Sequence, residues 1–554
     1  RVALVPQVLN LDATVVTASR RIEKLRDAPV AVALVGQREI RQSGASDLAT
    51  VLSEQAGLPL EGGTPSGVGV MLQGLDARRV LILVDGQPIV GRINGMLDLS
   101  RLPIANVARI EVVKGPQSTL YGSDAMGGVI NLITREPAPG GMGGGLAVTG
   151  GTQARLDFSG TALGALGPVA WTADAGRRTV SLVPGQDGDL ATLSQRWDGA
   201  GRARWRVDSS LTLESSVQLL NEDQRWRAGP VFFFADRQQA IGRLGATWQR
   251  GRTRSQTTLA YTMFDHLARR GLERRPSTPD GEKIRQRLLV GETFLSRPLG
   301  RTMLDGGVQL RHETAESPRV PGGMQVRSTA EPYAQATIGG DGWSLVPGLR
   351  LTADRVWGTH FTPRVAAMWR PSAPLALRLS AGRGFRAPDF NEQFIEFFHA
   401  DFGYRIRGNP ALRPELSDNV SGSVELAGTR LYVRADLFAN RFHDFIESRV
   451  IADTSNVTFF TYDNVGRGFA RGVDLEAVLR LGLVRVDAGW GALRAWDAAT
   501  HLPLLGRPRA NARLGVSAGT PGGLTGSITG VWTGRTPVAV DVNQELAERT
   551  GFLR

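Results

Sequence analysis

The chain has 554 residues, a formal net charge of +12, 42% hydrophobic residues and no cysteine. It is longer than one ordinary soluble domain, and the lack of cysteine excludes disulfide scaffolds, thiol catalysis and Cys-ligated metal sites. No run approaches the ~18 apolar residues of a transmembrane helix, which excludes a helical membrane protein but not a β-barrel with alternating strands. The chain begins at Arg1 without a signal-peptide pattern, so we expect a removed signal peptide or a fragment.

The positive charge comes almost entirely from arginines that are spread along the chain rather than clustered. Nucleic-acid binding favours a concentrated basic patch, so the dispersion argues against it. We therefore expect the arginines to line an aqueous lumen and to bind lipopolysaccharide phosphates at a membrane rim. A field of this sign would attract anionic ligands.

The first ~135 residues predict a mixed α/β domain, because short apolar runs alternate there with turn signals. Residues 11–18, LDATVVTA, form a β-prone run that would serve as an N-terminal edge strand. Ser46 is expected to cap a short helix that ends at Gly57. Pro103 is expected to open another short helix before the next strand.

Two buried strands are expected in the same domain. The first, Val80–Val84, stops at the turn residues Asp85-Gly86. Residues 109–134, RIEVVKGPQSTLYGSDAMGGVINLIT, predict a strand, a turn at Gly115-Pro116, one helical turn, and a second strand. Gly127-Gly128 would let two backbones approach closely where the second strand begins.

Residues 136–145, EPAPGGMGGG, predict a flexible linker, and the pattern changes after them. Residues 430–440 and 473–481 alternate strictly between apolar and polar, which indicates strands with one face against an apolar phase and one against water. We count about 19 such segments between Gly144 and Val538. A soluble β-sandwich or propeller is the alternative, but no blade-length repeat is found and long alternating strands favour a membrane barrel.

The segment 109–134 closely resembles the plug-domain signature of TonB-dependent outer-membrane receptors. Residues 83–88, LVDGQP, resemble the VDG turn of that family, and Gln73 stands where the family often has arginine. Three further segments resemble boxes in the family's barrel, namely residues 384–388, 408–415 and 464–474, the last with Asp474 where glutamate is usual.

The resemblance implies a transmembrane β-barrel of about 22 antiparallel strands with an N-terminal mixed α/β plug domain in its lumen. The implied parts are an N-terminal segment at 1–20, the plug at 21–136, a linker at 137–145 and the barrel at 146–554. The chain ends at Gly551–Arg554 on what looks like the start of another strand. We therefore expect roughly the last three strands of a 22-strand barrel to be missing from this sequence.

The function implied by the resemblance is energised uptake, across the Gram-negative outer membrane, of a scarce ligand too large for porins. Residues 11–18 would form the TonB box, to which a periplasmic TonB-type protein adds a strand. The residues of this candidate box are Leu11, Asp12, Ala13, Thr14, Val15, Val16, Thr17 and Ala18. The implied partners are the TonB-type protein, outer-membrane lipid and lipopolysaccharide, and an extracellular ligand. No nucleic acid is expected, and the chain would be a monomer.

The transported ligand is expected to be a ferric siderophore, which is the commonest cargo of the family. Cobalamin comes second, because the GSDAMGGVINLIT text looks similar to the cobalamin-receptor branch, and haem comes third. No permanently bound cofactor is expected. By analogy the plug loops 62–68 and 91–96 face the outer vestibule, where the candidate ligand-binding residues are Thr64, Ser66, Arg92, Asn94 and Met96.

Haem receptors of the family carry an axial histidine between the first two barrel boxes. His399 and Tyr404 would then be haem ligands, although an aromatic rim loop explains the same text. Asp187 and Asp189 are too few for a calcium site, so no metal site is expected. No HExxH, nucleophile elbow or phosphate-binding loop occurs, and no enzyme is expected.

Two alternatives of another class remain open at this point. A passive porin would conduct freely, and a plug in the lumen argues against it. A receptor that only signals would carry an extra N-terminal domain of ~80 residues, far longer than a loop. The few residues before Leu11 leave no room for such a domain unless it was cut off.

Overall fold

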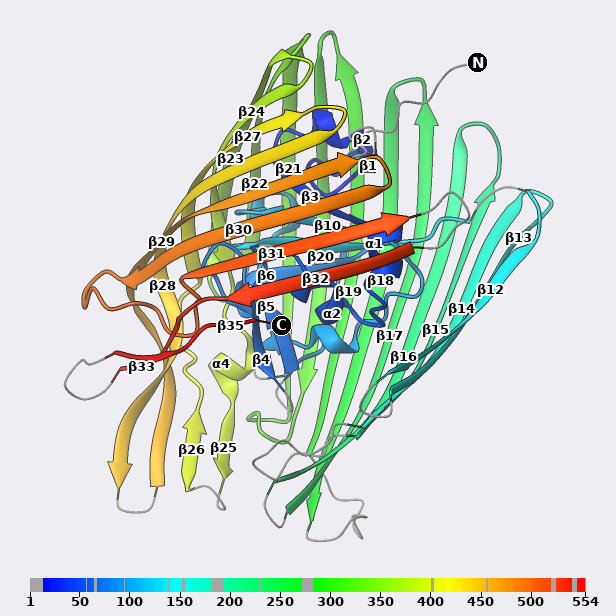
Figure 1. Ribbon diagram of the computed structural model, residues 1–554. Helices are drawn as coiled ribbons and strands as arrows, with labels where there is room; N and C mark the ends of the chain where they lie inside the picture. Colours follow the sequence, from blue (N-terminus) through cyan, green and yellow to red (C-terminus); the bar gives the residue numbers. More distant parts are fainter. Residues whose placement is uncertain are drawn as a thin grey trace.

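The computed structural model describes residues 13–55, 57–63, 67–93, 95–137, 140–151, 155–181, 193–228, 231–271, 282–399, 403–454, 457–519, 525–540 and 546–553. They form two units, an N-terminal plug and a large curved sheet around it (Figure 1). The mixed α/β domain is therefore observed as predicted, and the first long strand begins at Gly143.

The plug is built on a five-stranded sheet in the order β3-β10-β11-β6-β7. These strands are β3 (Val32–Gly36), β6 (Val80–Val84), β7 (Gln87–Pro88), β10 (Val107–Lys114) and β11 (Gly128–Thr134). Three two-stranded pairs accompany it: β1 (Thr14–Val15) with β2 (Glu23–Lys24), β4 (Leu60–Gly63) with β5 (Gly67–Val70), and β8 (Arg92–Ile93) with β9 (Met96–Leu97).

The helices of the plug are short. They are α1 (Gln37–Gln42), α2 (Leu48–Ser53), α3 (Ser118–Tyr121) and the 3-10 turns η1 (Leu25–Asp27), η2 (Ala77–Arg79) and η3 (Leu99–Arg101). Outside the plug, α4 (Phe390–Phe394) is a further short helix. No helix in the described residues has the length and apolarity needed to cross a membrane.

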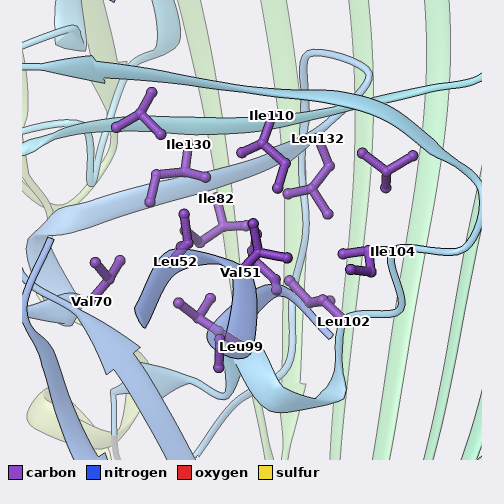
Figure 2. Packing of buried hydrophobic residues seen from close by; sticks show 14 of the residues in the cluster. Val51, Leu52, Val70, Ile82, Leu99, Leu102, Ile104, Ile110, Ile130 and Leu132 are labelled. Atoms are coloured by element: carbon purple, nitrogen blue, oxygen red, sulfur yellow. The ribbon is translucent and has the colours of Figure 1, made fainter. Parts of the chain in front are cut away.

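The core of the plug lies between its sheet and α2 (Figure 2). Val51 and Leu52 of α2 meet Ile82, Ile110 and Ile130 from three neighbouring strands, and all five side chains are buried. Burial of each such side chain contributes roughly 1.5–3 kcal/mol, so this cluster is a main source of plug stability.

Most elements predicted for the plug are present, and two details of the helices were wrong. Asp47, not Ser46, caps α2, because its carboxylate accepts a hydrogen bond from the Thr50 amide at 2.8 Å. Pro103 opens no helix. It forms a bridge with Asp47, and the nearby 3-10 turn η3 ends two residues earlier.

The strand–turn–helix–strand motif of residues 109–134 forms as predicted. Gly115 at the turn has a φ of +87° and Gly128 has a φ of +145°, both in the region that favours glycine. A Cβ on Gly128 would lie 2.3 Å from the Val113 carbonyl oxygen. The motif thus requires glycine where β10 and β11 come together.

The large sheet consists of long antiparallel strands. They are β12 (Gly143–Gly151), β13 (Arg155–Leu166), β14 (Val169–Ser181), β15 (Leu193–Arg206), β16 (Leu211–Ala228), β17 (Val231–Arg250), β18 (Thr253–Gly271), β19 (Glu282–Leu299), β20 (Thr302–Glu316), β21 (Met324–Gly340), β22 (Trp343–Asp354), β23 (Gly358–Ser372), β24 (Leu375–Arg386), β27 (Glu415–Ala427), β28 (Leu431–Thr454), β29 (Val457–Leu481), β30 (Val484–Asp497), β31 (Ala510–Gly519) and β32 (Thr525–Thr533).

Within the described residues the sheet has 22 strands. The 19 long strands agree in number with the alternating segments counted in the sequence, and the other three are short. β24 pairs directly with β27, while β25 (Glu396–His399) and β26 (Tyr404–Arg407) branch from the wall toward β29. The strand order of the large sheet begins at β12 and ends at β35 (Phe552–Leu553). A separate two-stranded sheet is formed by β33 (Thr536–Val540) and β34 (Leu546–Arg549).

The predicted alternation places apolar side chains outside the wall and polar side chains inside. On β28, Leu431 and Leu437 are 41% and 62% exposed, whereas Arg434 and Asn440 face inward and are buried. The exposed leucines are suited to lipid, and the inner face meets the plug.

The two ends of the sheet differ in the length of their connections. At one end two-residue turns join consecutive strands, as between β17 and β18 and between β19 and β20; at the other, β24 and β27 are joined by a long segment that includes α4. In outer-membrane barrels short turns face the periplasm and long loops face outward. On this basis β1 and β2 (top of Figure 1) lie near the periplasmic end and α4 (bottom) near the outer end.

Candidate functional site

An open cavity lies between the plug and the outer half of the wall. It holds about 1260 Å³ of empty space, open solvent included. Plug residues near β7 to β9 and after α3 form its floor, and strands β19 to β24 with α4 form its sides. A concave surface with an apolar floor and a few polar groups is the usual form of a ligand site.

The plug contributes an ion pair to the cavity. The guanidinium of Arg92 lies 3.5 Å from the carboxylate of Asp124, and it also donates to the carbonyls of Arg78 and Gly95 at 2.9 and 3.2 Å. Both members line the cavity. The pair joins the β8–β9 loop to the loop after α3, so both loops would respond to a ligand placed here.

The wall contributes aromatic rings that hold a cation. The Arg327 guanidinium carbon lies 4.6 Å from the centres of both the Trp357 and the Phe390 rings. Arg327 also donates to the Pro388 carbonyl at 2.7 Å. This stack fixes the segment that carries α4 against β21.

Arg92 is the one predicted plug residue that the structure places at the cavity among those it describes. Met96 lies instead against the β4–β5 pair, since its sulfur would be 2.9 Å from a Cβ on Gly69. Thr64, Ser66 and Asn94 lie outside the described residues. Their role as ligand contacts stays a prediction.

The two candidate haem ligands lie on the branch of the wall formed by β25 and β26. His399 and Tyr404 are partners in the register of that pair. The Tyr404 ring packs edge-on against Phe397 and Phe460, with centroids 6.3 and 6.1 Å away. No group of three or more metal-binding side chains occurs in the described part of the chain.

α3 connects the cavity to the interior of the plug. Asp124 donates its amide to the Phe385 carbonyl at 3.1 Å, and Ser123 accepts from the Ala387 amide at 3.0 Å. At the other side of α3, Arg350 donates to the Leu120 carbonyl at 3.0 Å and to the cavity residue Glu331 at 2.8 Å. Movement of the cavity wall would therefore be transmitted to α3.

The described part of the candidate TonB box is folded into the plug. Thr14–Val15 pairs with Glu23–Lys24, and Val15, Thr17 and Ala18 are fully buried or nearly so. The Glu111 carboxylate accepts from the amides of Val16 and Thr17, each at 2.9 Å, and from the Thr17 hydroxyl at 2.6 Å. Leu11 and Asp12 lie outside the described residues.

Arg20 joins the segment to α3 and to the wall. Its guanidinium carbon lies 4.5 Å from the Tyr121 ring centre and 5.0 Å from that of Tyr333, and it forms an ion pair with Glu292. Tyr121 in turn donates its hydroxyl to the Thr17 carbonyl at 3.1 Å. The last residue of α3 thus contacts the candidate TonB box directly.

The lumen arginines predicted from composition hold the plug in place. Arg378 and Arg434 of the wall each donate to a plug carbonyl at 3.0 Å, and Arg364 donates to Gln117 at 2.9 Å. On the plug side, Lys114 forms an ion pair with Asp474 at 2.6 Å. Gln73 makes an uncharged contact instead, accepting from Asn419 at 3.2 Å.

Glu23 provides a titratable group beside the candidate box. Burial raises its pKa to about 7, against the opposing effects of the Arg21 cation and the Ser19 hydrogen bond. The folded hairpin therefore favours protonated Glu23. Protonation of Glu23 therefore stabilises the folded hairpin fully below the ordinary pKa near 4.5. This stabilisation is lost as the pH rises from there to about 7, and the loss is up to about 3 kcal/mol.

We expect the β1–β2 hairpin to open more at pH 8 than at pH 5. Because the chain has no native cysteine, Ala13→Cys gives a single site for a spin label whose mobility reports opening. The mobile fraction should grow with pH in this variant and stay level when Glu23→Gln is added. An unchanged pH response in the Glu23→Gln background would contradict the assignment to Glu23.

Sequence reasoning did not find the wall residues of the cavity. Arg311, Glu313 and Asp354 lie on the inner face near the outer ends of their strands. The signal was present as the polar phase of each alternating run, but the sequence does not show which polar residues reach the same depth as the plug loops.

The comparisons with known proteins agree with this architecture. Residues 24–129 match the family described as TonB-dependent Receptor Plug Domain, and residues 143–552 match the family described as TonB dependent receptor-like, beta-barrel. Together the two matches cover most of the chain.

Related proteins include receptors of two kinds. The iron-regulated outer membrane virulence protein of Vibrio cholerae is 27% identical over 461 residues, covering 78% of this chain and 69% of that protein. The vitamin B12 transporter BtuB of Photobacterium profundum is 24% identical over 534 residues, covering 91% of this chain and 82% of that protein.

Solved structures show the same fold at lower identity. A mutant of the ferric enterobactin receptor PfeA from Pseudomonas aeruginosa superposes with a TM-score of 0.80 at 18% identity, covering 96% of this chain and 90% of that one. The siderophore receptor PirA from Acinetobacter baumannii gives 0.78 at 15% identity, covering 94% and 90%. With a plug, a wall of long alternating strands and both family matches in place, the chain belongs to the TonB-dependent receptor family of outer-membrane transporters, which are not enzymes.

Proposed function

We propose that this member of the family imports a scarce ligand, in the first place a ferric siderophore, which binds in the cavity between the plug and the outer half of the wall. The observation that carries the proposal is the chain of contacts from that cavity through α3 to residues 14–20. A transporter needs such a connection, because occupancy outside must change what a periplasmic partner can reach.

In this proposal residues 11–18 are the TonB box. The segment is held by polar contacts to a carboxylate, a tyrosine and an arginine, and Val15 and Ala18 also pack into a buried apolar cluster. Its release requires loss of these polar contacts and exposure of the two apolar side chains. A released β-prone segment can pair with an added strand from the partner protein. The exposed apolar outer face would contact lipid, with lipopolysaccharide at the rim.

The choice of ligand rests on the relatives and on the site. The names of the relatives include iron-regulated and siderophore receptors, and also a vitamin B12 transporter, so cobalamin is the second candidate. Haem is third, and the packing of Tyr404 between two phenylalanines gives the ring a structural role. The expectation that a positive field attracts anionic ligands does not hold for the cavity, because its described lining carries more carboxylates than guanidinium groups.

The passive porin is disfavoured by contacts around the circumference of the plug. The plug is tied to the wall by the pairs Lys114–Asp474, Arg20–Glu292 and Arg202–Asp85, whose wall residues lie on β29, β19 and β15. A plug held on several sides would block free diffusion through the lumen.

The test is uptake of radiolabelled iron chelates and cobalamin by cells that express this chain, with and without the TonB-type partner. We expect ligand to bind the cell surface in both hosts and to accumulate inside only when the partner is present. Fast, unselective swelling of liposomes that contain the protein would instead support a porin. Accumulation that does not depend on the partner would refute energised transport.

A further inference from the structure

The cavity lining carries more carboxylates than guanidinium groups within the described residues. The carboxylates are Asp124, Glu313, Glu316, Glu331, Asp354 and Asp389. The guanidinium groups are Arg92, Arg311, Arg327 and Arg386. The balance in the cavity is thus opposite in sign to the +12 of the whole chain.

Three of the four guanidinium groups are already engaged. Arg386 is almost fully buried and pairs with Glu415 at 2.6 Å and Glu392 at 2.9 Å. Arg92 pairs with Asp124, and Arg327 is stacked between two aromatic rings. An anionic ligand would have to break these contacts to use these cations.

Three carboxylates of the lining have no cationic partner among the described residues: Glu313 and Asp354 on the wall strands, and Asp389, which caps α4 by accepting from the amides of Asn391 and Glu392 at 2.7 and 3.3 Å. Glu313 forms neither an ion pair nor a hydrogen bond there, and Asp354 accepts only from the amides of Val356 and Trp357, at 2.6 and 3.3 Å. Arg311, on the same strand face as Glu313, is likewise without an ion pair within 4 Å in the described chain. The lining groups without an ion pair are therefore one cation and three anions.

A buried hydroxyl beside Asp354 is also unpaired. Thr352 lines the cavity on β22, is 3% exposed, and its hydroxyl has no hydrogen-bond partner in the described residues. A buried hydroxyl is normally satisfied, so this group is suited to a polar atom of a ligand. The unpaired hydroxyl therefore indicates a ligand site independently of the charge balance of the lining.

The remaining lining is apolar or aromatic. Ile89, Val90 and Leu97 of the plug lie at the floor, and Trp357 and Phe390 stand at the side. A ligand here would present apolar surface to the floor and polar donors to the wall.

We infer that the ligand carries no net negative charge and offers ammonium or amide N–H groups to Glu313 and Asp354. This inference rests on the proposed function and narrows it to uncharged or cationic ligands rich in amide groups. A ferric trihydroxamate and a corrinoid share that chemistry, whereas a ferric tricatecholate of charge 3− does not. Unpaired carboxylates would repel the last of these as it entered the cavity.

The inference is tested by equilibrium binding of four probes to the purified full chain in detergent. The probes are a linear ferric trihydroxamate with one free ammonium group, the same complex after N-acetylation, cyanocobalamin, and a ferric tricatecholate. The tightest binder should be one of the first three, and the tricatecholate should bind at least about tenfold more weakly. The ammonium and N-acetylated trihydroxamates differ by one charge at similar size, so they test the preference for a cation. Cyanocobalamin shows whether the natural ligand is a corrinoid or a hydroxamate.

Charge variants then locate the effect. Glu313→Gln combined with Asp354→Asn should raise tricatecholate affinity several-fold and weaken any preference for the ammonium form over the acetylated form. Glu476→Gln is the control, because Glu476 pairs with Arg434 on strands that do not line the cavity. It should leave all four affinities within about twofold of the unmodified protein.

Tightest binding of the tricatecholate by the unmodified chain would overturn the inference while leaving energised transport intact. An unchanged ranking in the double variant, or no binding by any of the three uncharged and cationic probes, would overturn it as well. Failure of the proposed function looks different: ligand would accumulate in cells without the TonB-type partner.

Discussion

Replacing Val15 by proline is expected to abolish energised uptake and to leave binding at the cell surface nearly unchanged. Proline fixes φ and removes the amide donor that strand pairing with a partner needs. Val15 pairs with Glu23 in the folded plug and is not among the residues that line the ligand cavity, so the cavity should keep its lining. Uptake should fall to the level seen without the partner, measured with labelled ligand in energised cells.

The control for this experiment is Val15→Ala, which shortens the same side chain but keeps the amide. It should transport, because the segment must leave the plug during coupling and its buried side chain is then exposed. Normal uptake by the proline variant would show that this segment is not the TonB box.

Glu415→Ala is expected to cause the largest loss of stability at the boundary between plug and wall. Glu415 is fully buried, and its carboxylate accepts from Arg79 at 2.6 and 2.9 Å, from Arg386 at 2.6 Å and from the Ile446 amide at 2.6 Å. Its removal leaves two buried guanidinium groups without this partner, which costs about 3–5 kcal/mol. Amide hydrogen exchange of β6, next to Arg79, should accelerate at least about 100-fold.

Glu447→Ala provides the matched comparison. Glu447 lies 3.6 Å from the same guanidinium of Arg79, but its side chain is 40% exposed. A partly exposed pair contributes about 0–1 kcal/mol, so exchange near β6 should barely change. Equal effects of the two substitutions would show that burial does not set the strength of this contact.

The sequence by itself determined the two-part architecture. Strict alternation in segments such as 430–440 requires a strand with one apolar and one polar face, and β28 has that arrangement. Residues 109–134 determined the plug motif, because glycine is required at residues 115 and 128 whatever the surroundings. Local patterns of this kind depend on neighbours along the chain.

The sequence determined the helix starts less well, because several neighbouring residues could each serve as the N-cap. Ser46 and Asp47 are both good caps, and only the position of the Thr50 amide selects Asp47. Pro103 is compatible with a helix start, but its pairing with Asp47 holds it in an extended bridge. Such choices are made by packing between distant segments.

The tertiary structure alone decided the chemistry of the cavity and the attachment of the N-terminal segment. Arg92, Glu313 and Asp354 are separated by long stretches of sequence and meet because strand register sets the height of each side chain on the wall. The overall charge of +12 suggested an anion site, yet wall arginines such as Arg378 and Arg434 are used to hold plug carbonyls. Which charges stay unpaired is a property of contacts in three dimensions, and no composition or spacing along the chain contains it.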